Sequence, residues 1–135
     1  MIKILIDTNV IIDYLANREP YADQAERIID MCADGEVTGI ITANSVTDIY
    51  YIMQKQAGRS KAMDGLRALL DVLDIAEVGK RDILNAADLN MDDFEDALVA
   101  TCAKRINAQY IISRNIKDYS NSPVSAIMPQ KFLTQ

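Results

Sequence analysis

Short apolar runs alternate along the chain with longer segments whose apolar residues recur every three or four positions. The runs have the length and composition of buried strands, and the segments between them have the period of amphipathic helices. This alternation predicts an α/β fold, a single domain over residues 1–135 with about five parallel strands and helices on both faces of the sheet. The predicted strands cover residues 2–6, 37–42, 75–78, 109–113 and 125–128.

Helix boundaries are predicted from capping and helix-ending residues. Pro20 suits the first turn of a helix, and Gly35 and Gly58 suit helix ends. Asp92 followed by Glu95 has the form of a capping box, which makes these two residues capping and solvated groups. The predicted helices cover residues 20–35, 45–58, 60–70, 81–87 and 92–106, and no linker or repeat divides the chain.

Half of the residues are hydrophobic, which is enough for one core in a chain of 135 residues. Cys32 and Cys102 lack metal-ligand spacing and fall in predicted helices, so we expect buried free thiols. The sequence contains no stretch of about 18 apolar residues and no signal-peptide pattern. We therefore expect a cytoplasmic protein without membrane association.

The absence of histidine restricts the chemistry of the chain. A Ser-His-Asp triad, a histidine-based ribonuclease mechanism and an ordinary zinc site all need imidazole, so catalysis must rest on carboxylates. The 20 acidic and 14 basic residues give a net charge of −6, which argues against nonspecific binding to a phosphate backbone. A nucleic-acid partner needs basic side chains or bound cations where it contacts the protein.

Five polar residues follow predicted strands or begin the helices after them. Ligand sites in parallel sheets lie at the carboxyl ends of the strands, so these side chains are expected to converge. Clustered carboxylates repel one another unless a cation lies between them, which predicts a Mg²⁺ or Mn²⁺ site. The candidate catalytic residues are Asp7, Asp48, Asp96, Asn115 and Asp118.

Four of the five candidates also have a structural explanation. Asp7 can serve as a turn or cap after its strand, and Asp48 can complete a capping box with Ser45. Asn115 and Asp118 lie in a polar loop where turn formation alone accounts for both residue types. These alternatives remain open at the level of the sequence.

Further polar residues near the candidates allow two interpretations. Asp93 shares a helix face with Asp96 and can join the site. Asn9 and Ser113 suit the orientation of carboxylates or waters, and turn bonding explains them equally well. The basic residues are expected to be solvated, with phosphate contact as the alternative; they are Lys55, Arg59, Lys61, Lys104, Arg105, Arg114 and Lys117.

Three segments resemble the PIN-domain nucleases: LIDTNVIIDYL at 5–15, DFEDALVATCA at 93–103 and YIISRNIKDYSNSPVSAIMPQKFL at 110–133. The likeness covers essentially the whole chain, and the three segments in this order are a specific signal. The resemblance implies a five-stranded parallel sheet and a magnesium or manganese site. In the bacterial branch of the family it implies VapC-like toxins that a cognate antitoxin neutralises.

The resemblance also implies metal ligands. Asp7 matches the first acidic residue of the family and Asp96 the third, while Asp48 stands where many members have Glu. Asn115 stands where many members carry a fourth acidic residue, and it brings no charge, although Asp118 lies close enough in sequence to compensate. The implied ligand set is therefore Asp7, Asp48, Asp96 and Asn115.

We predict a metal-dependent endoribonuclease that hydrolyses RNA with the help of one or two divalent ions and leaves 5′ phosphates. By resemblance it is the toxin of a toxin–antitoxin pair, with a homodimer through residues 45–71 as a further expectation. The alternative is a noncatalytic PIN-like module that binds RNA or a protein. A phosphatase of the haloacid dehalogenase kind needs a second Asp at Asn9, and the phosphoacceptor pattern of a receiver domain is absent.

Overall fold

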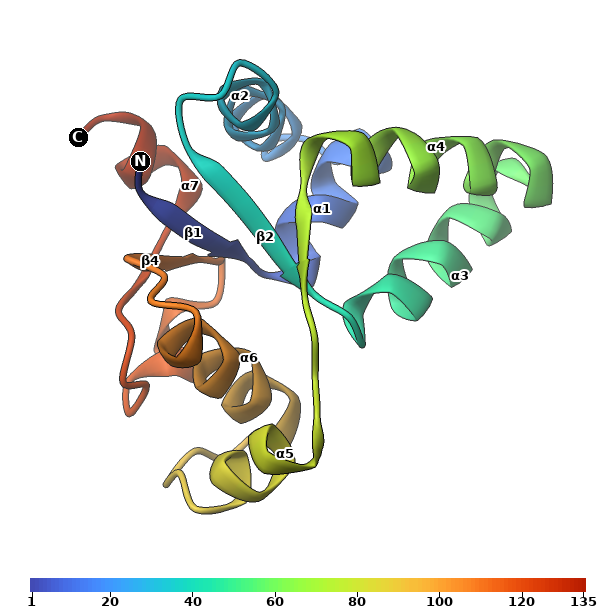
Figure 1. The fold of residues 1–135 in the computed structure, drawn as a ribbon. Coiled ribbons are helices and arrows are strands. Elements are labelled where there is room, and N and C mark those ends of the chain that lie inside the picture. Colours follow the sequence, from blue (N-terminus) through green and yellow to red (C-terminus); the bar gives the residue numbers. More distant parts are fainter.

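The computed structural model describes residues 1–135, and all five strands belong to one parallel sheet (Figure 1). The strand order is β3-β2-β1-β4-β5, which confirms the predicted sheet. The strands are β1 (Lys3–Ile6), β2 (Thr38–Thr42), β3 (Asp74–Ala76), β4 (Tyr110–Ile112) and β5 (Ala126–Ile127). The helices are α1 (Thr8–Leu15), α2 (Ala22–Ala33), α3 (Ser45–Ala57), α4 (Arg59–Val72), α5 (Lys80–Ala87), α6 (Phe94–Arg105) and α7 (Pro129–Leu133), with a 3₁₀ helix, η1 (Ile116–Tyr119).

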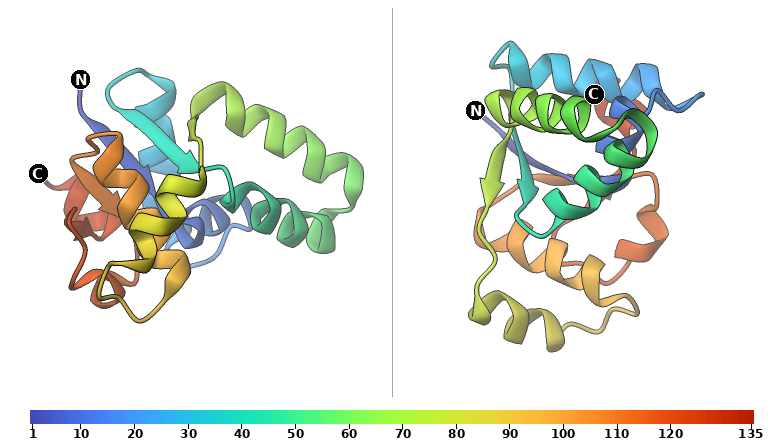
Figure 2. Two further views of the ribbon diagram at one scale, coloured as in Figure 1. Left: turned by 60° about the horizontal axis from the view of Figure 1, so that its bottom comes forward. Right: turned by 90° about the vertical axis from the view of Figure 1, so that its right-hand side faces the viewer.

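Alternate residues of the central strand β1 face the two helical layers (Figures 1 and 2). Ile4 and Ile6 belong to the core formed with α1, α2, α3, α4 and α7, whereas Leu5 belongs to the core formed with α6 and η1. Each of these side chains is fully buried, and such burial contributes about 1.5–3 kcal/mol per side chain. The continuous apolar run therefore reflects burial on both faces.

Two helices, α1 and α7, lie where the sequence predicted none. In α1 the buried residues are consecutive, Val10 to Asp13, so no polar face reveals a helical period. Its first turn is fixed by Asp7, whose carboxylate accepts a hydrogen bond from the Thr8 N–H at 2.8 Å. Asp7 therefore acts as a cap as well as a candidate site residue.

The predicted capping box at the start of α3 is wrong. Asn44 occupies the N-cap position without a side-chain cap, and Ser45 already lies in the first turn. The Ser45 hydroxyl is buried and lies 2.8 Å from the Thr42 hydroxyl, so it is not available to the helix terminus. Asp48 is exposed on α3 and is free of a capping role.

Three other helix starts differ from the predicted ones. Tyr21, not Pro20, is the residue that precedes α2. Gly58, with φ of 86°, joins α3 directly to α4, so Ser60 lies inside α4 and is not its cap. Asp93 caps α6 by accepting from the Asp96 N–H at 3.0 Å. The capping box predicted from Asp92 and Glu95 is therefore wrong by one residue.

The buried face of α4 also differs in part from the prediction. Met63 and Leu70, which were expected to point inward, are exposed.

Both cysteines are buried free thiols, as predicted. Burial raises the pKa of the Cys32 thiol to about 11, so this thiol stays protonated at neutral pH. None of the helices combines the length and the apolar character that crossing a membrane requires.

Gly39 in β2 allows α2 to approach the sheet closely. A Cβ at this position would lie 2.4 Å from the Cys32 Sγ and 2.7 Å from the Leu73 Cδ2. We therefore expect Gly39→Ala to destabilise the fold by about 1–3 kcal/mol through overpacking, measured as a lower melting temperature. Gly79→Ala is the control, because a Cβ there has no atom within 4 Å and its φ is −111°. An unchanged melting temperature for Gly39→Ala would contradict this account.

Candidate active site

The adjacent central strands β1 and β4 end side by side and bring Asp7 next to Ser113. The Asp7 N–H donates to the carbonyl of Ile112 at 2.9 Å, which continues the ladder one residue past β1. The fully buried Ser113 hydroxyl then donates to the Asp7 Oδ2 at 2.9 Å. The carboxyl edge of the sheet thus holds the first predicted site residue, in agreement with the rule for parallel sheets.

Asp7 is held by hydrogen-bond donors on both carboxylate oxygens. Its Oδ1 accepts from the Thr8 N–H, and its Oδ2 accepts from Ser113, from the Tyr119 hydroxyl at 3.0 Å and from the Asn9 Nδ2 at 3.5 Å. The amino terminus of α1 further favours a negative charge at this position. Asn9 and Ser113 therefore lie where the sequence predicted them, in contact with the first carboxylate.

Tyr119 connects two of the predicted carboxylates, Asp7 and Asp96. Its hydroxyl, 3.0 Å from Asp7, is also 3.3 Å from the Asp96 Oδ1 at the start of α6. The ring is buried in the core beneath α6, and burial together with the two carboxylates raises the pKa of this hydroxyl far above its usual range. Tyr119 therefore remains a neutral donor between two acidic side chains.

The site carries more negative charge than its surroundings compensate. Burial raises the pKa of Asp96 to about 6, with further upward contributions from Asp93, Asp7 and Asp118 that outweigh the hydrogen bond from Tyr119. Burial also raises the pKa of Glu95, as do the nearby charges of Asp48, Asp93 and Asp7. Acidic residues from β1, α3, α6 and η1 therefore influence one another electrostatically.

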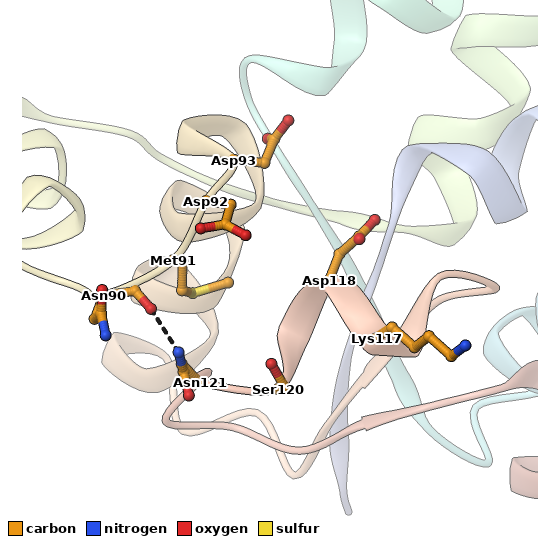
Figure 3. Close-up of a pocket in the computed structure, with 8 residues that line it drawn as sticks. All are labelled: Asn90, Met91, Asp92, Asp93, Lys117, Asp118, Ser120 and Asn121. Atoms are coloured by element: carbon orange, nitrogen blue, oxygen red, sulfur yellow. Dashed lines mark hydrogen bonds between the residues drawn. The ribbon is translucent and has the colours of Figure 1, made fainter.

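Asp118 lies at a small polar pocket beside this cluster (Figure 3). It faces Asp92 and Asp93, which belong to the segment that leads into α6. The Asn121 side chain closes one end of the pocket by donating to the Asn90 carbonyl at 2.8 Å. Asp118 and Asp93 are thus both brought to the site, while Asp92 lines the pocket and does not cap α6.

Asn115 and Asp48 make fewer contacts with the other candidate residues than Asp7 and Asp96 do. Asn115 is exposed, and its side chain makes no hydrogen bond with the other candidates; its backbone N–H donates to the Ser113 Oγ at 3.0 Å. Asp48 is linked to the other acidic residues only because its charge raises the pKa of Glu95. No three acidic or cysteine side chains are close enough together to enclose a metal ion in this conformation. The roles of Asn115 and Asp48 as metal ligands therefore stay predictions.

The basic side chains near the site divide into paired and unpaired groups. Arg114 binds the buried Asp13 through its Nε at 2.5 Å and stacks over the Tyr21 ring at 4.1 Å. Arg105 is bound to Asp82 at 2.8 Å. Lys117 lines the polar pocket and makes no ion pair, and its side chain extends away from the pocket in Figure 3. Lys117 is thus a basic residue at the pocket that is free to meet a phosphate.

Sequence reasoning missed three features of this site. Nothing in the sequence placed the Tyr119 hydroxyl between two carboxylates. Glu95 is exposed, as predicted, but the sequence did not indicate that it lies within the electrostatic reach of Asp48 and Asp7. The buried partner of Arg114 also carried no sequence signal, because Asp13 occurs within an apolar helix.

The parallel sheet and the acidic residues at its carboxyl edge define the class of protein. Residues 3–117 match the sequence profile of the PIN domain, and the chain belongs to this family. Ribonuclease VapC1 of Aquifex aeolicus is 26% identical over 138 residues, which cover 96% of this chain and 92% of that protein.

Solved structures show the same fold at low sequence identity. One chain of VapBC2 from Rickettsia felis, solved with a DNA fragment from its promoter, matches this chain with a TM-score of 0.73 and 17% sequence identity. The match covers 94% of this chain and 98% of that chain. VapC20 of Mycobacterium tuberculosis, described as a Sarcin-Ricin loop cleaving toxin, matches with a TM-score of 0.63 and 15% identity, over 80% and 86% of the two chains. The fold is therefore shared over nearly the whole chain.

Proposed function

We propose that this protein is a metal-dependent endoribonuclease and the toxin of a toxin–antitoxin pair. The observation that carries the proposal is the meeting of Asp7 and Asp96, from β1 and α6, around one hydroxyl at the carboxyl edge of the sheet. The name of the Aquifex aeolicus relative and the description of VapC20 support RNA as the substrate. The absence of histidine leaves carboxylates as the catalytic groups.

The donor set fits a hard divalent cation. Carboxylate and amide oxygens are the ligands that Mg²⁺ and Mn²⁺ prefer, and the excess negative charge around Asp96 gives a cation a favourable position. Asp7 and Asp96 would hold the ion, with Asp48 and Asn115 as further ligands and Asp118 close by. When bound, the ion would lower the pKa of an attacking water and neutralise charge on the leaving oxygen.

Other side chains of the site would orient the carboxylates and the substrate. Ser113 and Asn9 hold the Asp7 carboxylate in one position by donating to it. Lys117 would neutralise part of an RNA phosphate, which the net charge of −6 otherwise repels. RNA bound in an unstacked loop or single strand could bring its backbone to this edge, and hydrolysis would leave a 5′ phosphate.

The partner proposed for this chain is a cognate antitoxin. Several of the structural neighbours are chains of toxin–antitoxin complexes, including the VapBC2 structure and one from Klebsiella pneumoniae. A homodimer through the α3–α4 hairpin stays a prediction. Asn115 is exposed and uncharged where many members of the family carry a fourth acidic residue, and the cleavage experiment below separates the enzyme from a noncatalytic module.

Removal of divalent ions is expected to abolish RNA cleavage. Labelled single-stranded RNA and a structured tRNA are incubated with the purified protein in Mn²⁺, in Mg²⁺ and in EDTA, and cleavage is followed on denaturing gels. Cleavage with either ion and none in EDTA supports the proposal, because the carboxylates need a cation to act together. Binding of RNA without cleavage under every condition would instead favour the noncatalytic module.

A further inference from the structure

The Tyr119 hydroxyl occupies a special place among the side chains of the site, because it contacts both principal carboxylates. It lies 3.0 Å from the Asp7 Oδ2 and 3.3 Å from the Asp96 Oδ1, and these two residues are far apart in the sequence. Of these two carboxylates, Ser113 and Asn9 contact only that of Asp7. Tyr119 is thus the residue whose hydroxyl contacts both the carboxylate that follows β1 and the carboxylate at the start of α6.

The position of this hydroxyl is fixed by the rest of the side chain. Tyr119 is 4% exposed, and its ring belongs to the core that includes Leu5, Val99 and Val124. The residue lies at the end of η1, whose turn follows β4 directly. A hydroxyl carried by a packed ring cannot move far without disturbing this core. It is therefore a rigid support for the two carboxylates.

The contacts leave other carboxylate oxygens available. The Asp7 Oδ1 accepts only the Thr8 N–H, and a carboxylate oxygen has a second lone pair. The Asp96 Oδ2 has no hydrogen-bond partner. The hydroxyl has one proton, which it shares between one oxygen of each residue, and the remaining oxygens stay free to bind an ion.

We propose that Tyr119 is a positioning residue that sets the spacing and orientation of Asp7 and Asp96 for a divalent cation. This inference rests on the proposed metal-dependent function, but it concerns the affinity for the ion and not the cleavage step itself. Without the hydroxyl, two like charges would face each other with no donor between them, and their side chains would rotate apart. Residues that orient metal ligands typically change metal affinity or activity by about 10–100-fold when they are replaced.

The test is a Mn²⁺ titration of the wild type and Tyr119→Phe, followed by electron paramagnetic resonance of the free ion. We expect the dissociation constant of Tyr119→Phe to rise about tenfold or more. RNA cleavage by this variant should be weak at low Mn²⁺ and should return to the wild-type rate when Mn²⁺ saturates the site. Tyr110→Phe is the matched control, because Tyr110 packs edge-on against Phe132 on the opposite layer and donates no hydrogen bond to the site.

An unchanged Mn²⁺ affinity in Tyr119→Phe would overturn the inference, and so would a loss of cleavage that saturating Mn²⁺ does not restore. Mn²⁺ binding by a wild type that does not cut RNA would contradict the proposed function while leaving the affinity test of Tyr119 intact. A wild type that binds no Mn²⁺ would overturn both. If Tyr119→Phe does not fold, the ring signals of Tyr119 in the wild type should shift in NMR spectra as Mg²⁺ is added, and signals that stay fixed through the titration would refute the positioning role.

Discussion

Asp7→Asn is expected to lower the rate of RNA cleavage by more than about a hundredfold, which exceeds the usual effect of removing a residue that only orients a ligand. The substitution removes the negative charge from the carboxylate that contacts Ser113, Tyr119 and the start of α1. An asparagine has the same shape, but it offers one oxygen where the carboxylate offers two. At least one of the present donors therefore loses its acceptor.

The fold should survive this change. Asn caps a helix about as well as Asp, so α1 keeps its cap, and relief of the repulsion between Asp7 and Asp96 offsets part of the cost of the lost donor contacts. Initial cleavage rates at saturating Mn²⁺, together with melting temperatures, measure both effects. Asp23→Asn is the control, because Asp23 is an exposed carboxylate in the first turn of α2. Cleavage by purified Asp7→Asn at the wild-type rate would remove Asp7 from the catalytic machinery.

Arg114→Met is expected to destabilise the fold by about 3–5 kcal/mol, because it leaves the charge of Asp13 buried without a partner. Asp13 is 1% exposed, and both of its oxygens accept from the Arg114 guanidinium, at 2.5 and 3.2 Å. The same guanidinium stacks on Tyr21. Since whole domains are stable by only about 5–15 kcal/mol, this loss would be a large part of the total.

Substitution of the other partner of this ion pair, Asp13→Asn, should destabilise the fold less. In Asp13→Asn the unpaired group is Arg114, whose side chain is 22% exposed and can turn towards water. Urea unfolding of the wild type and the two single variants gives the free energies directly, with Arg105→Met as a comparison from an ion pair whose arginine is more exposed. A loss for Arg114→Met no larger than that for Asp13→Asn would show that the buried carboxylate does not depend on its partner.

The carboxyl-edge rule selected Asp7 and Asp96 as candidates from the sequence, but it did not predict how their side chains are held. Asp7 and Asp96 were selected because one follows a buried strand and the other opens a late helix. The helix caps were the weakest predictions: Ser45 turned out to bond Thr42, and Asp93 took the place predicted for Asp92. Caps depend on one residue of register and on competing local partners, which hydrophobic periodicity does not resolve.

The sequence by itself determined the five parallel strands and the two layers of helices, and it made carboxylates the candidate site residues. Strands buried on both faces must be apolar throughout, and a chain without histidine has few other groups for acid–base or metal chemistry. Only the tertiary structure decided that Tyr119 joins Asp7 to Asp96 and that Arg114 binds Asp13. Tyr119 and Asp7 are 112 positions apart in the sequence, and Arg114 and Asp13 are 101 positions apart. Such contacts depend on which strands are neighbours and how each side chain packs, and no local pattern records either.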